Sequence, residues 1–97
     1  MTRRFIVATD PLTSEQVQQL KTRLGGCGWW HWLPNFWLVK DSADAITVTM
    51  IRDWIHSING DARALVMQVE ETTWAALVKP GANGKSMSEW LKNTWPD

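Results

Sequence analysis

Asp10 and His31 are the two side chains of this sequence whose settings suggest chemistry. Asp10 follows a run of strand-forming residues and precedes Pro11. A lone carboxylate in that setting is more often a turn or capping group than a metal ligand, because magnesium sites usually take several carboxylates or a phosphate. His31 stands between two tryptophans. It is either a hydrogen-bonded or stacked residue of a sheet, or a group that contacts a phosphate or a base and exchanges a proton near neutral pH.

Tryptophan is the unusual residue of the composition, since the chain has eight Trp and no Tyr. Each buried Trp removes about 150–250 Å² from water, so eight exceed what the core of so short a chain normally needs. The surplus is expected at an interface, or in a platform on which nucleic-acid bases stack. Basic residues that could contact phosphates lie before the first strand and after the Trp-rich stretch. The candidate ligand-binding residues are Arg3, Arg4, Trp30, His31, Trp32, Trp37 and Lys40.

Length and charge restrict the class of protein. The chain has 97 residues, the length of one domain, and a formal net charge of zero from 10 basic and 10 acidic residues, so it is not expected to coat nucleic acid by electrostatics alone. The single cysteine, Cys27, cannot form an internal disulfide, which favours a reducing compartment. No neighbouring His or Asn would activate it, so it is not expected to be a nucleophile. No apolar run approaches the ~20 residues of a membrane span, so we expect a cytoplasmic protein without a membrane partner.

Strands and helices alternate in the elements that must position these residues. Thr13 and Gln16 have the capping-box spacing of a helix start, and Pro34-Asn35 predicts a turn between two strands. We expect strands at 4–9, 29–33, 36–40 and 64–69, one helix from 13 to 24, and another from between 42 and 47 to 57. This βαββαβ order predicts an α+β, ferredoxin-like domain over residues 1–97, with a four-stranded antiparallel sheet and two helices on one face. Its core spans 3–70, and residues 71–97 form a short strand or helix extension.

The expected sheet is apolar on both faces. Side chains alternate along a strand, so Phe5 and Val7 point to one face and Ile6 and Ala8 to the other. The helices can cover only one face, and the other would expose a larger apolar patch than monomers usually tolerate. We therefore expect a homodimer, or a C-terminal segment folded over part of this face. The opposed sets on the other strands are Trp29 and Leu33 against Trp30 and Trp32, Phe36 and Leu38 against Trp37 and Val39, and Leu65, Met67 and Val69 against Ala64 and Val66.

Four stretches, FIVATD, GWWHWLPNFWLVKDS, RALVMQV and TTWAALVKPGANGKSMSEWLK, resemble a family of small proteins labelled SinR-like, which is distantly similar to the small adaptation protein of CRISPR systems. The resemblance covers nearly the whole chain and implies a ferredoxin-like dimer that handles nucleotides or nucleic acid. In the nuclease-like relatives, an acidic residue at the end of the first strand holds a metal together with its dimer mate, and Asp10 falls at that position. Thr9 stands where those relatives have Tyr, and the basic surface for duplex DNA is thin here, which argues against catalysis.

The favoured function is a non-catalytic homodimeric binding protein for a nucleotide, an oligonucleotide or a partner protein, in a CRISPR-adaptation-like or defence-related setting. It would use no cofactor. The alternative is a metal-dependent endonuclease or endoribonuclease, in which Asp10 from both subunits is catalytic and holds Mg²⁺ or Mn²⁺. A module that only assembles with itself is a third possibility.

Overall fold

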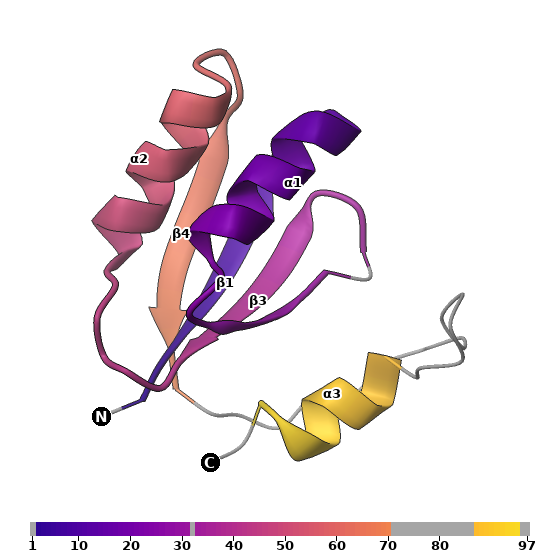
Figure 1. Cartoon of the computed structure of the whole chain (residues 1–97), viewed down its shortest axis with the longest axis vertical. Coiled ribbons are helices and arrows are strands. Elements are labelled where there is room, and N and C mark those ends of the chain that lie inside the picture. Colours follow the sequence, from indigo (N-terminus) through magenta and orange to yellow (C-terminus); the bar gives the residue numbers. More distant parts are fainter. Residues whose placement is uncertain (1, 32, 71–86, 96–97) are drawn as a thin grey trace.

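The computed structural model describes residues 2–31, 33–70 and 87–95 of the chain (Figure 1). The strands are β1 (Arg3–Thr9), β2 (Gly28–Trp30), β3 (Phe36–Asp41) and β4 (Ala64–Val69), and the helices are α1 (Ser14–Arg23), α2 (Val48–Ile58) and α3 (Met87–Asn93). The bounds of β4 coincide with the prediction, and β1 and β3 are each one residue longer than expected. The strand alternative for the C-terminal extension falls on residues outside the described ranges, and the described part of that extension is the helix α3.

The four strands form one antiparallel sheet in the order β2-β3-β1-β4. β1 is a central strand, and its Phe5 lies opposite Val39 of β3 and Gln68 of β4. β2 and β4 are the two edges of the described sheet. This is an α+β architecture with two main helices, and it is compatible with the ferredoxin-like fold that the sequence predicts.

Helices α1 and α2 cover the same face of the sheet (Figure 1). Phe5 and Val7 of β1 are buried there against Leu20 of α1 and Ile51 of α2, as the alternation along β1 predicts. Each such side chain contributes about 1.5–3 kcal/mol when it is fully removed from water. The other buried members of this cluster are Leu24, Trp37, Val39, Ile46 and Ile55.

Both of these helices begin at a threonine whose side chain caps them. The Thr13 hydroxyl accepts from the Gln16 backbone N–H at 3.1 Å, and the Gln16 side chain accepts from the Thr13 N–H at 3.0 Å, so the predicted capping box is confirmed. Thr47 accepts from the Met50 N–H at 3.2 Å and is the N-cap of α2. A threonine cap satisfies an N–H group that the first helical turn leaves unpaired, and α2 therefore begins at Val48, one residue after the predicted window.

The connection between β2 and β3 differs from the expected hairpin. The prediction that β2 reaches residue 33 is wrong, because pairing stops at Trp30. The predicted turn is present: the Phe36 N–H donates to the Leu33 carbonyl at 3.4 Å, and Asn35 has a φ of 64°, a conformation that asparagine tolerates. His31 therefore lies in the connection between β2 and β3 and not in a strand. Trp32 lies outside the described residues.

The opposite face of the sheet is partly covered by α3 and the residues that follow it. Leu91 and Trp95 form a second buried cluster with Trp30 of β2, so the C-terminal segment, the second of the two expected coverings, lies over part of this face. Partly buried side chains of Phe36, Leu38, Val69 and Trp90 surround this cluster. None of the helices in the described ranges combines the length and the apolar character needed to cross a bilayer.

Candidate functional site

His31 and Trp37, two of the residues singled out from the sequence, lie in direct contact. Their rings are stacked with 3.7 Å between centroids and 8° between planes. Trp37 is 0% exposed, and Trp29 of β2 meets it edge-on with centroids 5.8 Å apart. A nucleic-acid base could stack on Trp37 only by displacing His31, so this part of the Trp cluster is core and not an open platform.

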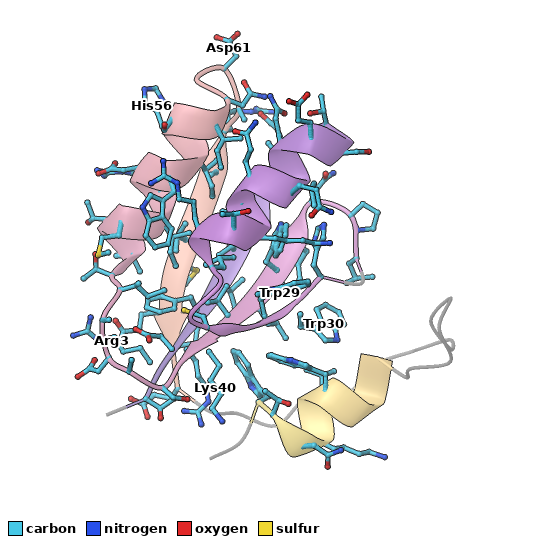
Figure 2. The ribbon with its side chains drawn as sticks, viewed as in Figure 1. Arg3, Trp29, Trp30, Lys40, His56 and Asp61 are labelled. Atoms are coloured by element: carbon cyan, nitrogen blue, oxygen red, sulfur yellow. The ribbon has the colours of Figure 1, made fainter. Side chains whose placement is uncertain are left out.

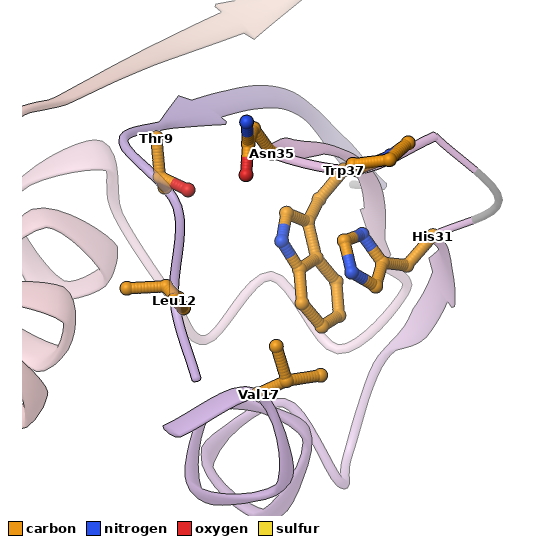
Figure 3. Close-up of a pocket in the computed structure, with 7 residues that line it drawn as sticks. Thr9, Leu12, Val17, His31, Asn35 and Trp37 are labelled. Atoms are coloured by element: carbon orange, nitrogen blue, oxygen red, sulfur yellow. The ribbon is translucent and has the colours of Figure 1, made fainter. Parts of the chain in front are cut away.

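A pocket of about 120 Å³ lies beside this stack (Figure 3). It is bounded by the end of β1, the start of α1 and the connection between β2 and β3. None of the described residues that line it is charged. They are Thr9, Leu12, Val17, His31, Pro34, Asn35 and Trp37.

Two buried polar atoms of the pocket residues have no hydrogen-bond partner among the described residues, and they are Thr9 Oγ1 and Trp37 Nε1. In Figure 3 the Thr9 hydroxyl and the indole nitrogen of Trp37 point toward the same space, which lies between these two side chains. A buried polar group without a partner costs about 1–3 kcal/mol, so native proteins usually provide water or a ligand at such a place. The pocket therefore has unmet hydrogen-bonding capacity at its wall.

His31 is held in one protonation state by its surroundings. Its Nδ1 lies 2.9 Å from the Phe36 carbonyl oxygen, which can only accept, so Nδ1 carries the proton. Burial lowers the pKa of His31 below its ordinary value of 6.5, the bond to Phe36 acts in the opposite direction, and the positive charge of Lys21 lowers the pKa further. At neutral pH the imidazole is thus uncharged, which does not favour the phosphate contact weighed from the sequence.

Asp10 lies at the end of β1, next to Thr9, and its carboxylate is bound by Arg63. Arg63 donates from Nε to Oδ2 at 2.9 Å, from Nη2 to Oδ1 at 3.0 Å, and from its backbone N–H to Oδ2 at 2.8 Å. These bonds lower the pKa of Asp10. Within residues 2–31, 33–70 and 87–95, no group of three or more His, Cys, Asp or Glu side chains is placed to hold a metal ion. A metal at Asp10 would have to displace Arg63.

The three basic candidates lie at the other end of β1, away from His31 and Trp37. Arg4 is opposite Lys40 in the sheet, and Figure 2 shows Arg3 and Lys40 at the end of the molecule away from Asp61. Each donates to a backbone carbonyl: Arg3 to Ile46 at 2.6 Å, Arg4 to Trp95 at 2.7 Å, and Lys40 to Thr94 at 2.5 Å. Arg3 also forms an ion pair with Asp44. These cations tie the loop before α2 and the end of α3 to the sheet.

Trp30 and Cys27 also have structural surroundings. Trp30 is 4% exposed under α3, on the face opposite Trp37, so the two tryptophans do not share a surface. Burial raises the pKa of the Cys27 thiol, and the negative charge of Asp41 raises it further. A thiol in this setting is a weak nucleophile.

Sequence reasoning missed Thr9 and Asn35 as pocket residues and Arg63 as the partner of Asp10. Thr9 has the same parity in β1 as Phe5 and Val7, so its orientation toward the helix side was readable from the alternation. No local signal joins Asp10 to Arg63, which is 53 residues away in the chain. Comparisons of the chain with protein-family models, with curated proteins and with solved structures find no match.

Proposed function

We propose that this protein is a non-catalytic binding protein that works as a cytoplasmic homodimer with a ferredoxin-like fold. The observation that carries the proposal is the exposure of Leu65 and Met67, which are 60% and 51% exposed on the sheet face opposite α1 and α2. Soluble monomers seldom leave large apolar side chains side by side in water. We propose that a second copy of the chain covers these two side chains, in line with the homodimer expected from the sequence.

Two half-buried residues of β1 lie beside the exposed pair. Met67 lies opposite Ile6 of β1, and Leu65 lies opposite Ala8. We call these four residues the open strip. The cluster around Trp30 and Trp95 covers the β2–β3 side of the same face, and the open strip is on the β1–β4 side.

The edge of the sheet adds a second reason for self-association. β4 is hydrogen-bonded only to β1 in the described sheet, and its sequence ALVMQV has no Pro or Lys of the kind that protects edge strands. A two-fold axis over the open strip would place the strips of two copies face to face, and both are apolar and uncharged. At about 25 cal/mol per Å², burying it yields several kcal/mol before association costs, so we expect a weak dimer that forms as the protein concentration rises.

Sedimentation equilibrium of the wild type and of a Leu65→Lys, Met67→Lys variant tests the proposal. The wild type should pass from 11.1 kDa to twice that mass with rising concentration, and the variant should remain at 11.1 kDa with an unchanged circular dichroism spectrum. Leu33→Lys and Met50→Lys are matched controls, because both residues are exposed and apolar but lie off the strip. A wild type that stays monomeric throughout, or controls that dissociate as readily as the double variant, would refute it.

A further inference from the structure

We infer that the pocket beside Trp37 is a binding site for an uncharged heterocycle of nucleobase type, recognised at its edge by the indole N–H of Trp37 and the hydroxyl of Thr9. The inference gives a ligand class to the binding function proposed above, but it rests on the pocket alone. The open strip lies on the other face of the sheet, so the pocket does not depend on the dimer.

The indole N–H of Trp37 is a buried hydrogen-bond donor without an acceptor among the described residues. Trp37 is 0% exposed, its Nε1 has no partner within the described ranges, and an indole N–H can only donate. The ligand must therefore present an acceptor, such as a ring carbonyl or an unprotonated ring nitrogen. Thr9 Oγ1 is buried without a partner at the same pocket and can donate or accept, so it fits either group beside that acceptor.

The lining of the pocket restricts the charge of its ligand. Among the described residues the lining includes no Asp, Glu, Lys or Arg, and His31 is neutral at pH 7 for the reasons given above. An ionised phosphate or carboxylate would have no compensating charge inside the pocket and would pay a large desolvation cost. The bound group is therefore uncharged, and any phosphate attached to it would remain outside.

The volume and the walls of the pocket restrict the size of the ligand and the way it meets Trp37. The pocket of about 120 Å³ is well above the roughly 10–15 Å³ of probe volume that a single water needs, so it has room for several waters or one small ring. Leu12, Val17 and Pro34 supply apolar walls, and Asn35 adds an amide that Figure 3 shows beside the Thr9 hydroxyl. Because His31 occupies a face of the Trp37 indole, the ligand meets this indole at its N–H edge and does not stack on it.

NMR of ¹⁵N-labelled protein reads this site directly, because each of the eight Trp has one indole N–H signal. A Trp37→Phe variant assigns the Trp37 signal by its disappearance. Titration with uracil, cytosine or adenine, each to its solubility limit, should move that signal at neutral pH, and benzoate, a flat ring with a charged group, should not. No shift with any base, or a shift with benzoate alone, would overturn the inference.

Thr9 variants separate recognition from folding. Thr9→Val keeps the shape of the side chain and removes its hydroxyl, so it should weaken base binding about tenfold, the equivalent of one hydrogen bond. Thr9→Ser should retain binding, and Thr49→Val, on the exposed side of α2, is the matched control. Equal affinity of Thr9→Val and wild type would contradict the role of Thr9. The titration is repeated on the Leu65→Lys, Met67→Lys variant. Base binding by this monomeric variant would show that the pocket binds its ligand independently of dimerisation.

Discussion

Arg4 and Trp95 connect β1 to the end of α3. The Nε of Arg4 donates to the Trp95 carbonyl oxygen at 2.7 Å, and its guanidinium lies 5.9 Å from the centroid of the Trp95 indole. Arg4 is buried in this position, with 6% of its surface exposed. Arg4 thus joins the residues after α3 to the sheet by a charged hydrogen bond and a cation–π contact, beside the bond from Lys40 to Thr94.

Replacing Arg4 with Met should loosen α3. The variant keeps an apolar stem but loses the donor to Trp95, so we expect the free energy of unfolding to fall by about 1–3 kcal/mol. Chemical denaturation measures this fall in the free energy of unfolding. A red shift of the Trp fluorescence emission should accompany it, because Trp30 and Trp95 become exposed to water. Lys92→Met on the exposed side of α3 is the control and should change stability by less than about 0.5 kcal/mol. Equal stabilities of the two variants would show that Arg4 does not hold α3.

Asp41 should be a stability residue, although it was not singled out from the sequence. It is 1% exposed, and its carboxylate accepts from the N–H groups of Ala43 at 3.2 Å, Ala45 at 2.6 Å and Ile46 at 2.8 Å. Asp41→Ala leaves these donors without their acceptor, so the free energy of unfolding should fall by about 2–4 kcal/mol in a urea titration.

Asp53→Ala is the matched control for Asp41→Ala. The Asp53 side chain is 62% exposed and pairs with its neighbour Arg52, so its loss should cost less than about 0.5 kcal/mol. If Asp41→Ala is no less stable than Asp53→Ala, the loop before α2 is held by other contacts.

The stability of the protein should depend on the charge of His31. Burial lowers the folded-state pKa of His31 below its ordinary value of 6.5, so the unfolded chain binds the proton more readily. The contribution of neutral His31 is therefore complete above pH 6.5 and is lost as the pH falls from 6.5 through the folded-state pKa. Melting temperatures of wild type and His31→Phe between pH 8 and pH 5 measure this effect, because Phe keeps a ring on Trp37 but does not titrate.

The wild type should lose more stability than His31→Phe over that pH range. An NMR titration of the His31 ring protons gives the pKa itself, and a His56→Gln variant removes the signals of the other histidine. A His31 pKa above 6.5 would contradict the prediction.

Asp10 should not support metal-dependent cleavage. Its carboxylate is already bound at both oxygens by Arg63, so Mg²⁺ or Mn²⁺ would have to compete with a bidentate ion pair. We expect wild type and Asp10→Asn to leave RNA and DNA equally intact in the presence of either metal. Cleavage that requires the metal, is lost in Asp10→Asn and persists in Asp61→Asn would instead establish the nuclease alternative.

Much of the fold could be predicted because its signals are local. Thr13 with Gln16 specifies a helix start within three residues, and the alternation of β4 specifies its two faces within six. The end of β2 could not be predicted, because His31 is a reasonable strand residue. What removes it from the ladder is a bond to Phe36 and a stack on Trp37, and both depend on the completed connection.

The candidate site was only partly readable for a similar reason. His31 and Trp37 were singled out by residue type, and the structure brings them together. Arg4 and Lys40 were assigned to phosphate, but their hydrogen bonds reach residues 91 and 54 positions away, and no sequence window of helical or strand length contains both partners. The missing partners of Thr9 and Trp37 are a property of the packed pocket and not of any motif.

Coverage of the second sheet face by α3 has a consequence for synthesis on the ribosome. Trp30 and Phe36 emerge well before Leu91 and Trp95, which shield them in the finished protein. At about 5–20 residues per second, the interval is roughly 3–13 s. Through that time the nascent chain presents bare aromatic rings to the cell, so its yield should depend on chaperones that bind such rings more than the small size of the domain suggests.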